Sequence, residues 1–479
     1  MPKPLLPDAF IDLQDGRLGL APAVADGAHA KVGVSTLGAP GAVLTITSVD
    51  DVAAKLGRGP LAEACAKSAR MGNLPVYAVP AQASVPGSVG AVTKTGGGTS
   101  DLAVAGNPRD DLEVVVRVTR PAANLAANTA AVAVSLDGGD TWGQETAVPV
   151  SGVLNALQAE TGLTLTFSAG SFVEGATHAF AATGPAMNAG DMQAAVGAAL
   201  SSPYGFEGVH LVGVASGAVA VAFFALIDGA ASAFRYLFGV AEARTPAPGE
   251  TIDAWKAALQ TEFAALSSKR AVVVSAFGEV VSQLTGRQER RNLAANAVAW
   301  ALLGSVSQSV GEVARGGVGG GIVSLGHDEY KSPGLDAAGF LTMRTITDLK
   351  GFYVTQGRTF AGPTSDLQYL ENLRTVNKMS RLARLAALRF AQARVRVTED
   401  GLLDPRDLEV IQSYIRNPLE AMVAEGDLSA VQVVIDPAQN VLSTRTIVVD
   451  VNGVPVGVAA WVGVRLGFLN PRLRVPAAA

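Results

Sequence analysis

The sequence predicts a multidomain α/β protein: a mixed, largely parallel core sheet with flanking helices, an inserted all-β sandwich domain, and extended terminal β-arms. Three observations support this prediction. Apolar strands and helices alternate between residues 187 and 290. Short strands with period-two alternation fill residues 91–186. An unusually long alternating segment lies near the C-terminus.

The N-terminal 25 residues are rich in proline and lack helical periodicity, so we predict an extended arm over residues 1–25. The core is predicted over residues 26–90 and 187–400. Its first part combines short strands with one helix, which begins at the Gly59-Pro60 signal and runs to about Met71. The predicted strands are Lys31–Ser35, Val43–Thr47 and Val76–Val79.

Residues 91–186 form a predicted insertion of different character. A turn-rich linker over residues 81–100 leads into it, and Asp137-Gly138-Gly139-Asp140 forms a tight turn within it. Short alternating strands separated by turns are typical of a small β-sandwich. The predicted strands are Leu112–Thr119, Ala131–Leu136, Leu163–Phe167 and Ala179–Thr183.

The α/β pattern resumes at Met187. The apolar run Leu211–Ile227 has 17 residues, whereas a bilayer span needs about 20, so we read it as a buried strand and the start of a helix. A membrane partner is therefore not expected. The predicted elements are strands Val209–Val214, Tyr236–Val240 and Ala271–Phe277, and helices Val219–Phe234, Ile252–Leu266 and Asn292–Leu303.

A long helix is predicted over Asp366–Arg394, with an apolar face and an opposite basic face. Such a basic stripe is either a solvated face or a contact surface for an acidic partner. Its members are Arg374, Lys378, Arg381 and Arg384.

Residues 401–453 are predicted as a C-terminal α+β part of the core. Asp404 caps a helix that opens with Pro405 and runs to residue 425. Strands follow at Val431–Ile435 and Thr444–Val451.

Residues 454–479 are predicted as a C-terminal β-arm. Alternation from Val454 to Phe468 covers fifteen residues, about 50 Å if fully extended, whereas a typical strand has about 5–6 residues. Such a strand can leave its own domain and pair with another chain. A bent strand within one sheet is the alternative. The apolar arm residues are Val456, Val458, Ala460, Val462, Val464 and Leu466.

Composition and motifs argue against several classes of protein. The net charge is −5, which does not favour a nucleic-acid partner, and the single cysteine, Cys65, excludes an intramolecular disulfide framework and a cysteine-based zinc site. The four histidines lack metal-binding spacing. The glycine-rich loop 316–321 lacks the lysine and the glycine spacing of a phosphate-binding motif. We predict no enzyme, and no catalytic, cofactor-binding or metal-binding residue.

Residues 335–389 resemble the sheath proteins of contractile phage tails, closest to the branch of transposable, Mu-like phages. The family's tryptophan near the Arg-Thr strand is absent, and Phe352 and Tyr353 can replace its packing. The resemblance covers roughly residues 190–479, with weaker support at 26–80. The matching positions are Leu335, Gly339, Arg358, Thr359, Asp366, Arg374 and Arg381.

The resemblance implies a structural subunit that stacks in rings around a tail tube and contracts. Terminal arms would complete the sheets of neighbouring copies, with Phe10, Ile11 and Leu13 in the N-terminal arm. Residues 91–186 would lie on the outer surface and residues 401–453 near the tube, with Arg406 at a possible contact surface. Expected partners are other copies, the tube, and baseplate and terminator proteins, in a virion tail assembled in the host cytoplasm.

Two other functions remain open from sequence. One is an α/β hydrolase or nucleotide-binding enzyme that uses the loop 316–321. The other is a surface adhesin that binds through residues 91–186.

Overall fold

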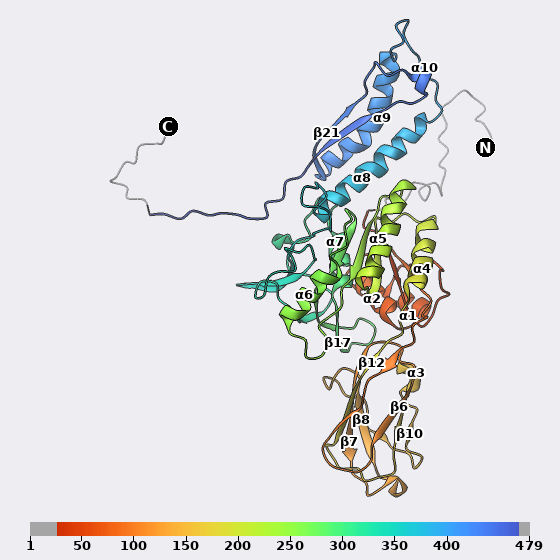
Figure 1. The fold of residues 1–479 in the computed structure, drawn as a ribbon, viewed down its shortest axis with the longest axis vertical. Helices are drawn as coiled ribbons and strands as arrows, with labels where there is room; N and C mark the ends of the chain where they lie inside the picture. The colour runs from red at the N-terminus through yellow and green to blue at the C-terminus, as the bar shows by residue number, and fades with distance from the viewer. Residues whose placement is uncertain (1–25, 469–479) are drawn as a thin grey trace, which may run out of the picture.

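A six-stranded sheet organises the centre of the computed structural model, which describes residues 26–468 (Figure 1). Its strand order is β15-β14-β13-β1-β3-β2, and every neighbouring pair is parallel except β2 and β3. The mixed, largely parallel sheet predicted from sequence is therefore present. Its strands are β1 (His29–Gly33), β2 (Leu44–Ile46), β3 (Val76–Pro80), β13 (Gly208–Val214), β14 (Phe238–Glu242) and β15 (Ala271–Val274).

Helices cover both faces of this sheet because neighbouring residues of each strand point to opposite sides. Val79 of β3 packs in the apolar cluster of α4 and α5, whereas Ala78 packs in the cluster of α1 and α2. The predicted Thr251 cap is confirmed, since its side chain accepts a hydrogen bond from the backbone N–H of Ala254. The helices are α1 (Val49–Leu56), α2 (Pro60–Arg70), α4 (Ala189–Ser201), α5 (Gly217–Ser232), α6 (Ile252–Glu262) and α7 (Ala294–Leu303).

The inserted residues form two further sheets, in the orders β4-β12-β7-β8-β9, with β5 paired to β12, and β10-β11-β6. A separate apolar cluster, drawn from residues 89–182, lies between them. Figure 1 shows this part at one end of the molecule. Its elements are β4 (Ser88–Val89), β5 (Thr93–Thr95), β6 (Leu102–Gly106), β7 (Leu112–Arg120), β8 (Ala131–Ser135), β9 (Thr146–Ala147), β10 (Val153–Leu154), α3 (Gln158–Thr161), β11 (Leu163–Phe167) and β12 (Thr177–Thr183).

The region after β15 differs from the sequence prediction. The strand expected over Ala271–Phe277 is wrong as one element, because β15 ends at Val274 and Phe277 begins β16 of a separate antiparallel sheet, β17-β16-β18. A two-stranded hairpin, β19–β20, follows. These strands are β16 (Phe277–Val281), β17 (Gln288–Asn292), β18 (Ile322–Leu325), β19 (Met343–Ile346) and β20 (Leu349–Val354).

The C-terminal elements form a small α+β unit at the opposite end from the insertion (Figure 1). Helix α8 (Leu370–Ala387) is shorter than predicted, and α9 (Pro405–Ala424) has the expected Asp404 cap. Strand β21 (Leu428–Val434) is followed by α10 (Val441–Thr444). The strand expected over Thr444–Val451 is wrong, because β22 spans Asp450–Pro455.

None of the helices in the described part of the chain combines the length and the apolar character needed to cross a bilayer. The apolar run that we interpreted as a strand and a helix divides into β13 and α5, as expected.

Candidate assembly surface

The C-terminal segment leaves the body of the protein as a single extended chain (Figure 1). Regular pairing stops at Pro455, and residues 456–468 belong to no strand or helix. A Cβ atom added at Gly457, Gly463 or Gly467 would meet no other atom within 4 Å. The alternative of one bent strand within a single sheet is therefore wrong beyond Pro455, because no second strand lies beside this segment within the described residues, and the arm that pairs with another chain stays a prediction.

The apolar side chains predicted for the arm lie in solvent. Val462 is 80% exposed and Leu466 is 94% exposed. Burying apolar surface is worth about 25 cal/mol per Å², so a segment of this composition has a strong tendency to find a partner surface. All the predicted arm residues are exposed in the structure: Val456, Val458, Ala460, Val462, Val464 and Leu466.

The sheet from which this segment emerges has two open edges. Within residues 26–468, β21 pairs with β22 alone. A two-stranded sheet is marginally stable by itself, and α9 supports this one by packing Ile415 and Leu419 near Leu428 and Val433. The outer edge of each strand still presents backbone N–H and C=O groups that an added strand can pair with.

Phe10, Ile11 and Leu13, predicted for the N-terminal arm, lie outside the described residues. The first described residue, Asp26, is bound by Lys378 and Arg381 of α8. The chain therefore enters the core beside the helix that carries the C-terminal unit.

The basic stripe of α8 binds groups of its own chain, which corrects both interpretations of the sequence, the solvated face and the contact surface for an acidic partner. Arg374 is 1% exposed and donates to Glu207 at 2.9 Å and to the carbonyl of Ala301 at 2.7 Å. Glu207 also accepts the backbone N–H of Gly27 at 2.6 Å. A buried charge is tolerated only when it is paired and hydrogen-bonded, and this site satisfies both conditions.

Lys378 and Arg384 also bind within the chain. Lys378 binds Asp26 at 3.2 Å, Glu425 at 2.9 Å and Asp427 at 2.7 Å. Burial alone would lower the pKa of Lys378, but these carboxylates raise it above its ordinary value. The guanidinium of Arg384 lies 4.2 Å from the ring centre of Phe234. The stripe therefore joins α8 to the start of β1 and to the loop before β21.

Arg406, the remaining predicted contact residue, lies exposed in the first turn of α9. Its backbone N–H donates to the carboxylate of Asp404 at 2.8 Å. The contact of the Arg406 guanidinium with a partner protein stays a prediction.

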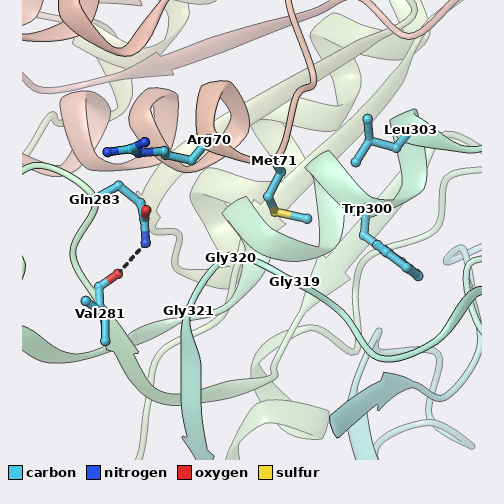
Figure 2. Close-up of a pocket in the computed structure, with 9 residues that line it drawn as sticks. All are labelled: Arg70, Met71, Val281, Gln283, Trp300, Leu303, Gly319, Gly320 and Gly321. Atoms are coloured by element: carbon cyan, nitrogen blue, oxygen red, sulfur yellow. Dashed lines mark hydrogen bonds between the residues drawn. The ribbon is translucent and has the colours of Figure 1, made fainter.

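The glycine-rich loop 316–321 does not form an anion cradle. It borders a shallow cavity that Arg70, Met71 and Trp300 also line (Figure 2). The carbonyl of Gly320 accepts hydrogen bonds from Lys67 Nζ at 2.8 Å and from the side chain of Asn296 at 3.2 Å. Phosphate binding needs backbone N–H groups and a free cation directed at the ligand, whereas here the nearby lysine is directed at carbonyl oxygens.

A buried row of titratable groups crosses the core sheet and was not foreseen from sequence. Lys31 Nζ lies 3.2 Å from His210 Nδ1, and His210 Nε2 lies 2.9 Å from Glu242. Burial lowers the pKa of Lys31 to about 8 and raises the pKa of Glu242 to about 7. Lys31 and His210 are fully buried, whereas Glu242 borders a small cavity. The described residues contain no group of metal-binding side chains.

The partners of the basic stripe were missed because they are far away in the sequence. Glu207 and Asp26 stand 167 and 355 residues before Arg374 and Arg381, respectively. One signal could have indicated that the stripe is bound within the chain. Only 16% of the residues are charged, and an exposed stripe of four basic residues is unexpected in such a chain.

Solved structures align with nearly the whole chain. A chain of the anti-feeding prophage baseplate in the contracted state has a TM-score of 0.55 at 11% identity, covering 99% of this chain and 100% of that one. The contracted helical sheath of the anti-feeding prophage gives 0.52 at 13% identity, with 97% and 99% covered. The sheath complex of an extracellular contractile injection system called PVC gives 0.51 at 13% identity, with 99% and 100% covered.

The protein therefore has the fold of the sheath proteins of the anti-feeding prophage and of an extracellular contractile injection system. The predicted resemblance is confirmed at this level, and the assignment to the branch of transposable phages stays a prediction. Models of the two DUF2586 domains match residues 6–358, for the N-terminal domain, and 366–473, for the C-terminal domain. The chain belongs to the DUF2586 family. No curated protein matches the sequence.

Proposed function

We propose that the protein is a structural subunit of a contractile tail sheath, which polymerises as stacked rings through β-strand addition between copies. One observation carries this proposal: within residues 26–468, the apolar segment 456–468 pairs with no strand, and it leaves a two-stranded sheet whose edges are open. Each copy therefore offers an extended segment without a pairing partner and a sheet with open edges. These are the two components of a contact made by β-strand addition.

The alternation of the segment supports strand addition in particular. Its even positions from Val456 to Phe468 are all apolar, whereas the odd positions are glycines apart from Ala459, Trp461 and Arg465, so one face of an added strand would be continuously apolar. The apolar residues Ile415 and Leu419 of α9 already line one side of the receiving sheet. An added strand would extend this apolar layer while its backbone pairs with β21 or β22.

Contraction and the remaining partners belong to the same proposal. The sheath surrounds a tail tube, and its contraction drives the tube through the host envelope. It meets baseplate and terminator proteins at its ends, in a virion tail that assembles in the host cytoplasm. Residues 401–453 face the tube, and residues 91–186 face outward. No catalysis, nucleic acid or membrane is involved.

Deletion of residues 456–479 tests the proposal. Purified full-length protein should form tubes in negative-stain electron microscopy, and the truncated protein should remain as folded monomers, with an unchanged circular dichroism spectrum. Tubes of normal appearance from the truncated protein would exclude the arm as the assembly element.

Charge reversal at Arg406 tests the tube-facing surface separately. Arg406→Glu should leave sheath tubes intact and reduce their binding to the tail tube in co-sedimentation. Unchanged binding would remove this residue from the proposed contact.

A further inference from the structure

The inserted β domain shares no apolar core with the rest of the protein. Its apolar cluster is drawn from residues 89–182, and the other apolar clusters of the described chain contain no residue from that range. Apolar packing is the main force that fixes one domain rigidly on another, so this domain must be oriented by other contacts.

A narrow neck connects the domain to the core. The entering and leaving chains pair through Val85 and Ala186, with reciprocal backbone hydrogen bonds of 3.0 and 2.9 Å. Beside the neck is a cleft of about 540 Å³, lined by Thr36 and Arg58 of the core and by Asn107 of the inserted domain. On this side of the neck, the core and the inserted domain are therefore separated by open space.

The contacts beyond the neck join basic groups of the core to carboxylates of the inserted domain. Arg287 donates to Glu160 at 2.7 Å, and Arg58 approaches the same carboxylate at 3.3 Å. The hydrogen bond from Arg287 lowers the pKa of Glu160, so this carboxylate is ionised at neutral pH.

The β16–β17 hairpin supplies the other core groups. Arg291 binds Asp110 at 2.7 Å, and the side-chain amide of Gln288 donates to Asp140 at 3.0 Å. Glu289 also binds Arg291, at 2.6 Å, and so holds the guanidinium in place from the core side. One hairpin therefore meets the inserted domain through charged and polar side chains.

We propose that these ion pairs form an electrostatic latch that sets the angle of the inserted domain, and that the domain pivots about the Val85–Ala186 neck when the latch opens. The contacts between Arg58, Arg287 and Glu160 are the outer part of the latch, because these groups are partly exposed, whereas the pair Arg291–Asp110 is its inner part. Exposed ion pairs contribute little and are screened by salt, so the outer part opens first. This inference concerns one chain and does not depend on polymerisation.

Double electron–electron resonance on the full-length protein tests the latch by measuring the distance between two spin labels, one in the inserted domain and one in the core. Spin labels at Ala147→Cys in the inserted domain and Ala225→Cys in α5 report the angle, and the buried native Cys65 should stay unlabelled. Labelled chains are diluted into an excess of unlabelled chains so that only distances within one chain contribute.

Glu160→Arg should broaden the distance distribution and shift its maximum, because it replaces attraction to Arg58 and Arg287 with repulsion. Adding Arg287→Glu to this variant should narrow the distribution again. The matched control is Arg120→Glu, which reverses a charge in the pair Arg120–Glu145 inside the inserted domain and should leave the distribution unchanged.

Salt provides a test on the unmutated latch. Raising the salt concentration from about 0.1 M to about 1 M shortens the screening length from about 10 Å to about 3 Å and should broaden the distribution. A distribution that stays narrow in Glu160→Arg and at high salt would overturn the proposal. Equal broadening by Arg120→Glu would also overturn it, since the cause would then be general loosening.

Discussion

Arg374 and Glu207 form an ion pair in which both side chains are 1% exposed, with Nη2 and Oε1 2.9 Å apart. The pair joins α8 to the start of β13, and the backbone N–H of Gly27 binds the same carboxylate. It therefore connects the beginning of the core sheet to the helix that carries the C-terminal unit.

Arg374→Met should destabilise the protein by roughly 3–5 kcal/mol, because Glu207 would be left buried and unpaired. Thermal or denaturant unfolding measures the loss. The double variant Arg374→Met with Glu207→Met should lose less than the single variant, since no unpaired charge remains. An equal or larger loss in the double variant would mean that packing, and not charge, dominates at this site.

Glu242→Gln should flatten the dependence of stability on pH. The folded protein holds the Glu242 proton with a pKa of about 7, against 4.5 as the ordinary value, because burial disfavours the charged form. Raising the pH from about 4.5 to about 7 should therefore cost the wild type roughly 3 kcal/mol more than the variant.

Unfolding at a series of pH values measures this difference. The exposed substitution Glu145→Gln serves as the control and should reproduce the wild-type profile. A parallel loss of stability in wild type and Glu242→Gln would show that other groups cause the pH dependence.

The two faces of the C-terminal segment should differ in their effect on assembly. Val462→Asp puts a charge on the apolar face and should abolish tubes, whereas Ala459→Asp puts the same charge on the opposite face and should reduce assembly less. Light scattering and electron microscopy measure the outcome. Equal effects of the two variants would argue against a strand with one buried face.

Replacing either of two glycines of α5 by alanine should change the stability of the protein, in opposite directions at the two positions. A Cβ at Gly229 would meet no atom within 4 Å, so Gly229→Ala should stabilise the helix by about 0.5–1 kcal/mol. A Cβ at Gly217 would lie 2.0 Å from the carbonyl oxygen of Glu262, so Gly217→Ala should destabilise. Melting temperatures that shift in the same direction for both would contradict this arrangement.

The core elements were predictable because local signals and tertiary structure agree there. Thr251 caps α6, Pro60 opens α2, and the apolar strands lie in the parallel sheet as expected. The wrong predictions occur where the pairing between strands, and not the local sequence, decides where an element ends. Residues 271–277 read as one apolar strand, but the chain changes sheets after Val274, and no local pattern marks that change.

The candidate assembly surface was predictable in part. Alternation after Val454 identified the segment, but not that its regular pairing ends at Pro455, which depends on the length of β21. Helical periodicity shows that α8 has a basic face, but it could not show what that face contacts. The contacts depend on acidic residues such as Glu207 and Asp427, which only the fold brings to that helix.

The Val85–Ala186 pairing has a consequence for how such a chain can diversify. Because the polypeptide returns to the place where it departed, an unrelated module with adjacent ends could be grafted there without rerouting the sheet. The same junction gives engineers a point at which to replace residues 88–183 with a cargo or a tag, while the remaining scaffold keeps its connections.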